Sequence, residues 1–172
     1  TPCLIDIGVE TYTKTTFSKD RYTLLPMRSS YHNLVNFPPL EEHDGKEFCG
    51  KTLILDENRA SFDITSAFEK KRGLDKYIRT AFFDRKNMKI EITEDFITGN
   101  PAVLSLISVE KPIQEGNTLK WSDFHADFSK DITARTEEME IKDARLRRAW
   151  PEKLYRTLIT LPEALTWVID LS

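Results

Sequence analysis

Residues 77–93 read Tyr77-Ile78-Arg79-Thr80-Ala81-Phe82-Phe83-Asp84-Arg85-Lys86-Asn87-Met88-Lys89-Ile90-Glu91-Ile92-Thr93. The end of this stretch places Met88, Ile90 and Ile92 on one face and polar residues on the other, the period of two of a half-buried strand. The polar segment 84–87 is typical of a tight turn between two strands. The stretch therefore predicts a β-hairpin.

Similar short apolar runs recur along the whole sequence. They predict further strands over residues 3–7, 51–55, 102–109, 118–121, 123–128, 133–141, 154–160 and 166–171. Turn-forming residues separate several of them, at 99–101, 114–117 and 161–162. Helical periodicity is confined to residues 143–150, and prolines at 26, 38 and 39 predict loops or edge segments over 17–47. We therefore expect an all-β fold, a sandwich or a barrel.

Size and charge narrow the class of protein. A chain of 172 residues fits one domain, so we expect residues 1–172 to form a single unit. The net charge of −3 gives no electrostatic preference for nucleic acid, and no apolar run is long enough for a membrane-spanning helix. We expect neither nucleic acid nor a membrane as a partner. Cys3 and Cys49 lie outside any zinc-binding spacing and are predicted to be small buried hydrophobic residues.

The apolar run at residues 3–7 begins almost at the first residue of the chain. A strand there needs neighbours to satisfy its backbone groups, and the stretch that follows it is rich in loops. This placement predicts that the chain is the C-terminal part of a longer protein.

Two residues are the main candidates for chemistry. Asp6 interrupts an apolar run, where a carboxylate must be paired, hydrogen-bonded or bound to a metal unless it faces solvent. His32 lies in a polar stretch bracketed by prolines and is either a surface histidine or a ligand for a metal or a sugar. Together they would supply two ligands, and zinc needs at least a third. His43, His125 and the basic run 145–148 are predicted to be solvated.

Several motifs, in order along the chain, resemble the C-terminal region of heparinase II/III-like polysaccharide lyases. The first are Leu4-Ile5-Asp6-Ile7-Gly8, similar to the family's "IDxG", and Ser29-Ser30-Tyr31-His32-Asn33, similar to its "SxxHN". The segment 62–68 resembles "DIT-A-Y" with Phe68 in place of Tyr, and 77–96 resembles a "W-R-T…DR…ITDDF" hairpin with Tyr77 in place of Trp. Residues 143–156 resemble the closing "D-RL…W…YR" pattern.

The resemblance implies a C-terminal antiparallel β-sandwich whose parent protein also carries an N-terminal α-helical toroid. Such proteins cleave uronate-containing polysaccharides, here a heparin- or heparan sulfate-like glycosaminoglycan, by β-elimination, with most catalytic groups in the helical domain. It implies a structural zinc site with Asp6 and His32 as ligands, an incomplete site in this chain, and Tyr12 and Asn33 as cleft residues. It also implies a periplasmic or secreted protein, an acidic polysaccharide and the helical domain as partners, and no activity for the chain alone.

Two other classes stay open beside the lyase. One is a non-catalytic carbohydrate-binding or structural sandwich that stacks sugar rings on exposed Trp121, Trp150 or Trp167. The other is an interaction domain of the immunoglobulin type, which fits less well because the Cys…Trp…Cys spacing is missing.

Overall fold

The computed structural model describes residues 2, 4–69 and 73–172. Its strands are β1 (Val35–Asn36), β2 (Lys51–Leu55), β3 (Arg59–Asp63), β4 (Leu74–Asp84), β5 (Lys89–Thr98), β6 (Ala102–Ser108), β7 (Ile113–Glu115), β8 (Thr118–Lys120), β9 (His125–Phe128), β10 (Thr133–Glu140), β11 (Lys153–Leu161) and β12 (Leu165–Asp170). The described residues also form six single-turn 3-10 helices, of which the first four precede β1: η1 (Thr15–Phe17), η2 (Arg21–Thr23), η3 (Leu25–Met27), η4 (Ser29–Tyr31), η5 (Thr65–Ala67) and η6 (Leu146–Arg148). None of these helices has the length and apolar character needed to cross a bilayer.

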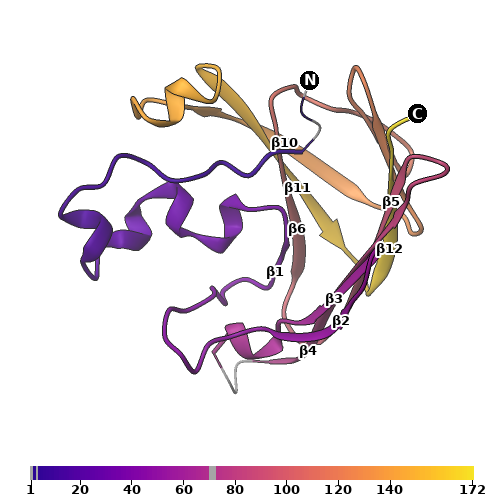
Figure 1. Cartoon of the computed structure of the whole chain (residues 1–172), viewed down its shortest axis with the longest axis horizontal. Coiled ribbons are helices and arrows are strands. Elements are labelled where there is room, and N and C mark those ends of the chain that lie inside the picture. The colour runs from indigo at the N-terminus through magenta and orange to yellow at the C-terminus, as the bar shows by residue number, and fades with distance from the viewer. Residues whose placement is uncertain (1, 3, 70–72) are drawn as a thin grey trace.

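The strands form two antiparallel sheets that face each other (Figure 1). One has four strands in the order β1-β6-β11-β10, and the other has eight in the order β2-β3-β4-β5-β12-β9-β8-β7. The predicted antiparallel β-sandwich is therefore confirmed.

The β4–β5 hairpin is the longest strand pair of the larger sheet, and it is the one that residues 77–93 predict. Asp84 shapes its turn, because one carboxylate oxygen accepts the backbone N–H groups of Lys86 and Asn87, each at 3.1 Å. These two bonds hold the pKa of the Asp84 carboxyl below its usual value, together with a side-chain bond from Asn87, which is the largest cause.

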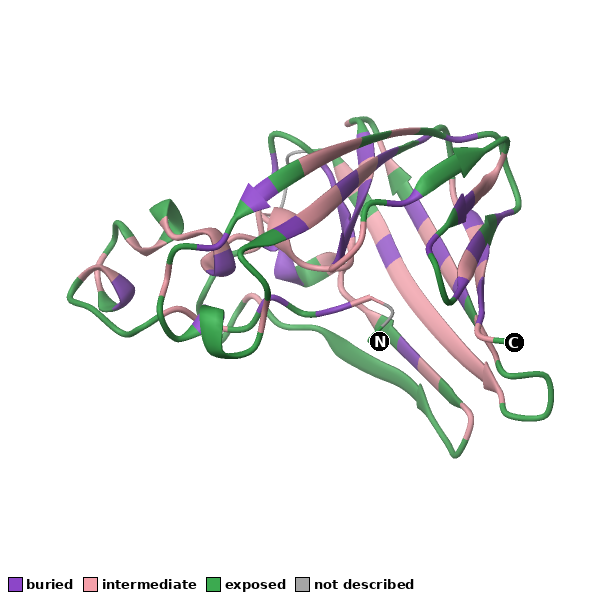
Figure 2. Ribbon diagram, turned by 90° about the horizontal axis from the view of Figure 1, so that it is seen from above, coloured by how far each residue is buried: buried purple, intermediate pink, exposed green. Residues whose placement is uncertain are grey.

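The main core lies between the inner faces of the sheets, and buried residues recur at every second position in strands such as β9 and the middle of β5 (Figure 2). The smaller sheet contributes Leu104, Leu106 and Ile159, and the larger one contributes Ala126 and Trp167, all at most 1% exposed. A second, smaller cluster covers part of the outer face of the smaller sheet: Ile5, Ile7, Ile107, Met139, Ile141, Leu146 and Leu154.

A polar network is enclosed within the main core. Glu94 is fully buried, and its carboxylate accepts the Tyr77 hydroxyl at 3.0 Å and the Trp167 indole N–H at 3.3 Å. Arg79 pairs with the same carboxylate at 3.2 Å and also donates to the carbonyl of Asn33. Burial, and then the nearby Glu94 charge, raises the pKa of Tyr77 well above its usual value, so the hydroxyl stays a donor.

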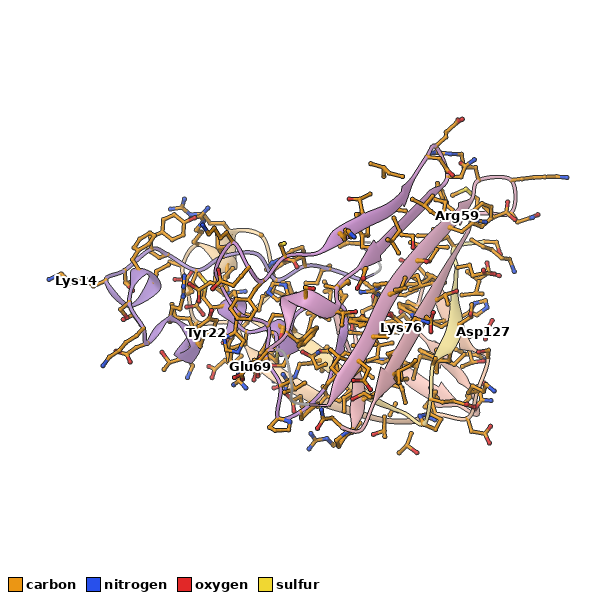
Figure 3. The ribbon with its side chains drawn as sticks, turned by 90° about the horizontal axis from the view of Figure 1, so that it is seen from below. Lys14, Tyr22, Arg59, Glu69, Lys76 and Asp127 are labelled. Atoms are coloured by element: carbon orange, nitrogen blue, oxygen red, sulfur yellow. The ribbon has the colours of Figure 1, made fainter. Side chains whose placement is uncertain are left out.

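The N-terminal lobe, residues 11–31, projects from one side of the sandwich and contains η1 to η4 (Figure 1). Figure 3 shows Lys14 and Tyr22 on this lobe, away from Arg59 and Asp127 on the sandwich. The prolines at 26, 38 and 39 lie in this lobe and in the loop after β1, as the sequence predicts. The lobe exposes Phe17 to 77%.

Over the described residues 4–7, the predicted strand 3–7 is wrong as a strand. Within these residues a single bridge joins Leu4 to Ser108, and the Ile5 N–H donates to the Ile107 carbonyl. Side chains from distant parts of the chain donate to the backbone carbonyls of this segment: Asn33 donates to the carbonyl of Ile5, and Trp150 donates to the carbonyl of Ile7. These bonds satisfy the segment without a strand ladder, which the apolar pattern alone does not reveal.

Other expectations need correction in detail. Cys49 is exposed, because it lies in the irregular segment that leads into the edge strand β2, and Cys3 lies outside the described residues. The short strands β1, β3 and β7 are not predicted by the sequence. The edge strand β2 is exposed along its whole length, and its pairing with β3 shifts register between Thr52 and Ile54.

Candidate functional site

The structure brings Asp6 and His32 into direct contact. Nδ1 of His32 lies 2.7 Å from Oδ2 of Asp6, although the residues come from separate segments 26 positions apart. The Asp6 side chain is 64% exposed and that of His32 is 28% exposed, so the pair lies at the surface. The carboxylate of Asp6 thus faces outward, and its partner is the imidazole.

Each member of the pair has a second bond that fixes its orientation. The other Asp6 oxygen accepts the backbone N–H of Gly8 at 2.9 Å, and Nε2 of His32 lies 3.1 Å from the carbonyl of Pro26. Gly8 has a φ of +82°, a backbone conformation that glycine adopts without steric cost. Both ring nitrogens of His32 therefore face oxygen acceptors, the backbone carbonyl of Pro26 at Nε2 and the Asp6 carboxylate at Nδ1.

Asn33 ties together the segments that carry the pair. Its side-chain amide donates to the Ile5 carbonyl at 2.9 Å, and its amide oxygen accepts the Ile107 N–H at 2.7 Å. The Asn33 carbonyl in turn accepts Arg79 from the buried network around Glu94. Asn33 therefore fixes the segments next to Asp6 and His32, and Arg79 inside the sandwich holds the backbone of Asn33 in place.

Tyr12 lies apart from this pair, on the N-terminal lobe. Its ring is 57% exposed, contacts Phe17 edge to face at 5.5 Å between centroids, and lies 5.2 Å from the guanidinium carbon of Arg145. The structure therefore brings Asp6, His32 and Asn33 together and leaves Tyr12 in a separate exposed cluster.

The donor set near Asp6 and His32 fits part of a metal site. A carboxylate and an imidazole are residue types that bind zinc, and a second ring nitrogen held by a backbone carbonyl is the usual support for a metal-bound histidine. No group of three or more His, Cys, Asp or Glu side chains is placed to hold an ion within residues 2, 4–69 and 73–172. Burial is the largest cause that raises the pKa of the nearby Glu42 carboxyl above its usual value.

The tryptophans do not form the sugar-stacking surface that the alternative reading requires. Trp121 is 8% exposed and stacks on Phe124, and Trp167 is 1% exposed and stacks on Phe128, so both belong to the core. Trp150 is half-buried and donates its indole N–H to Ile7. The expectation of exposed Trp121 and Trp167 is therefore wrong, because the aromatic residues of these strands face inward.

His43 and the run 145–148 are placed as predicted. His43 is exposed beside Phe48, and of the basic run only Leu146 is buried, where it caps the second cluster. His125 is half-buried at the surface of β9, with Nε2 3.3 Å from an Asp127 carboxylate oxygen.

Solved structures with a similar fold are found, whereas comparison of the sequence itself finds no match. No family model and no curated protein matches this sequence. Among solved structures, heparinase III matches with a TM-score of 0.61 and 17% identity, over 98% of this chain and 27% of its own. Heparan sulfate lyase HepC from Pedobacter heparinus matches with a TM-score of 0.63 and 11% identity, over 96% and 28% of the two chains. A mutant of HepC gives 0.62 and 11% over the same shares.

These matches define the class of fold. The chain is an antiparallel β-sandwich with the fold of the C-terminal portion of heparinase III, as the motif resemblance predicts. It spans little more than a quarter of the length of the solved structures that it matches.

Proposed function

We propose that this chain is the β-sandwich part of a polysaccharide lyase that cleaves a uronate-containing glycosaminoglycan, of the heparin or heparan sulfate type, by β-elimination. The observation that carries the proposal is the Asp6–His32 contact, formed within a fold shared with heparinase III and HepC over nearly the whole chain. The parent protein would act on its polysaccharide in the periplasm or outside the cell.

The β-elimination reaction has three chemical requirements, which we do not assign to this chain alone. Removing the proton at C5 of a uronate requires a base and neutralisation of the adjacent carboxylate, and the leaving glycosidic oxygen must gain a proton. We assign these roles to an upstream helical domain. The sandwich would shape the cleft, with Tyr12 and Asn33 as candidate wall residues, and the chain alone would be inactive.

The Asp6–His32 pair would hold a structural zinc, with the remaining ligands from residues outside this chain. Zinc would contribute positive charge that fixes Asp6 and His32 together. The chain's own residues orient the two ligands, through Gly8 at the carboxylate and Pro26 at the imidazole.

The lyase proposal is tested on the full-length protein. We expect it to release unsaturated uronate from heparan sulfate, seen as rising ultraviolet absorbance, and the 172-residue chain alone to release none. A full-length protein that binds the polysaccharide without cleaving any uronate polymer would instead support the non-catalytic carbohydrate-binding module.

The zinc proposal has a separate readout. We expect the full-length protein to carry zinc by elemental analysis and to melt at a lower temperature after chelation. Asp6→Ala and His32→Ala should each lower the zinc content, whereas His43→Ala, an exposed histidine away from the pair, should not. Equal zinc content in all four proteins would exclude Asp6 and His32 as ligands.

A further inference from the structure

A cleft of about 670 Å³ lies on the outer face of the smaller sheet, and its lining includes neither Asp6 nor His32. The register places Arg135, Arg156 and Leu158 on this face, where Arg135 pairs with Leu158 and Arg156 with Glu137. The opposite wall comes from the segment 28–41, which includes η4 and the loop after β1. The smaller sheet therefore forms the floor of the cleft, and the segment 28–41 forms its wall.

The cleft is positively charged in a protein that is negative as a whole. Its lining contains three arginines, Arg28, Arg135 and Arg156, and one acidic residue, Glu41. The whole chain has a net charge of −3. A local excess of positive charge in a concave surface attracts anionic ligands.

Arg156 is held in place by several contacts, and the Glu137 carboxylate balances its charge. Its Nε and Nη2 lie 2.8 and 2.7 Å from one Glu137 oxygen, and Nη1 donates to the Ser30 carbonyl at 3.0 Å. Its guanidinium carbon lies 3.9 Å from the centroid of the Tyr31 ring, and the side chain is only 12% exposed. Arg156 thus supports the wall and is not itself open to a ligand.

Arg28 and Arg135 are the arginines open to a ligand. Arg28 is 40% exposed, lies 3.3 Å from a Glu41 oxygen and has its guanidinium carbon 5.6 Å from the centroid of the Tyr31 ring, and Arg135 is 76% exposed and reaches Glu137 only at 3.9 Å. Each guanidinium has five N–H donors, so most of these donors stay free for a carboxylate or a sulfate.

Two further polar atoms of the lining are unused by the protein. Oδ1 of Asn36 and Oγ of Ser30 are buried without a hydrogen-bond partner in the described part of the chain, and Asn36 is 6% exposed. Buried polar atoms are almost always paired in native proteins, so these two call for a partner. Both atoms belong to residues that line the cleft, so the polar part of its lining is not fully satisfied by the described residues.

We propose that this cleft binds an acidic saccharide unit, with its carboxylate or sulfate group between Arg28 and Arg135 and its ring over the apolar floor of Val103 and Leu158. The choice of a saccharide rests on the proposed function, whereas the charge and the unpaired polar atoms do not depend on it. Single-stranded nucleic acid fits less well, because it needs open aromatic faces and Arg156 covers the Tyr31 ring.

The test is calorimetric titration of the 172-residue chain with a heparan sulfate tetrasaccharide at fixed ionic strength. We expect saturable binding, weakened about tenfold or more in Arg135→Ala and in Arg28→Ala, as loss of a charge-assisted bond predicts. Arg135→Lys should lose part of the affinity, because lysine keeps the positive charge but lacks the paired N–H donors of the guanidinium group. Arg148→Ala, an exposed arginine outside the cleft, should bind like the wild type. Melting temperatures confirm that each variant is folded.

Three comparison ligands decide what the cleft recognises. A neutral chitin tetrasaccharide should not bind, and equal binding would overturn the role of the arginines. Inorganic sulfate should compete only at far higher concentration, and equal potency would reduce the site to a simple anion site. Preferential binding of a single-stranded oligonucleotide would overturn the saccharide assignment. Each titration is independent of the cleavage assay, so the cleft can fail while the lyase proposal stands, and the reverse.

Discussion

Glu94→Ala is expected to lower the free energy of unfolding by about 3–5 kcal/mol, the usual cost of removing one member of a buried ion pair. Glu94 is fully buried, and the substitution leaves Arg79, the Tyr77 hydroxyl and the Trp167 indole N–H without their shared acceptor. Glu94→Gln should cost less, because the amide oxygen still accepts. Urea denaturation, with the free energy extrapolated to water, measures both effects.

Glu91→Ala is the matched control for this prediction. Glu91 lies on the same strand, three residues earlier, with its side chain exposed. We expect a change within about 0.5 kcal/mol, as is usual for surface positions. Similar losses for Glu91→Ala and Glu94→Ala would show that the network around Glu94 does not stabilise the sandwich.

Phe37→Ala is expected to cost about 3–5 kcal/mol, the range for truncating a buried Phe. Phe37 is fully buried after β1 and packs edge to face against Phe68, Tyr77 and Phe96, with ring centroids 5.2 to 5.5 Å apart. Removal of the Phe37 ring would leave a cavity where the loop after β1 packs against the larger sheet. Thermal and urea unfolding both report the change.

Phe17→Ala provides the contrast for Phe37. Phe17 is 77% exposed on the N-terminal lobe, so we expect its removal to leave the unfolding free energy nearly unchanged. Phe37→Leu should recover much of the stability by refilling the space. A Phe37→Ala protein that unfolds at the same urea concentration as the wild type would contradict the assignment of Phe37 to the core.

The sequence predicts the sandwich because its strongest signals are local. Alternation over 88–93 and the turn at Asp84 define the hairpin without any knowledge of the partner sheet. Continued by one residue, the same alternation places Glu94 on the face of Ile90 and Ile92. A buried carboxylate at that position is a signal that periodicity alone could have identified.

Contacts between distant segments could not be predicted in the same way. The failure of the strand at 3–7 depends on Asn33 and Trp150, side chains far along the chain that take its carbonyls. The motif resemblance did suggest Asp6 with His32, whereas the cleft between Arg28 and Arg135 was missed, because it exists only once a loop folds over the outer face of a sheet. Nor does the sequence reveal which tryptophans face inward.

The register shift of β2 affects how the exposed edge of the larger sheet can pair with another chain. An edge strand with Leu53, Ile54 and Leu55 exposed is a template onto which another copy could add a strand. Between Thr52 and Ile54 the extra residue breaks the even spacing of backbone donors and acceptors, so an incoming strand can match only two or three residues before losing step. The irregularity therefore disfavours the addition of a strand from a second copy of the chain at this edge.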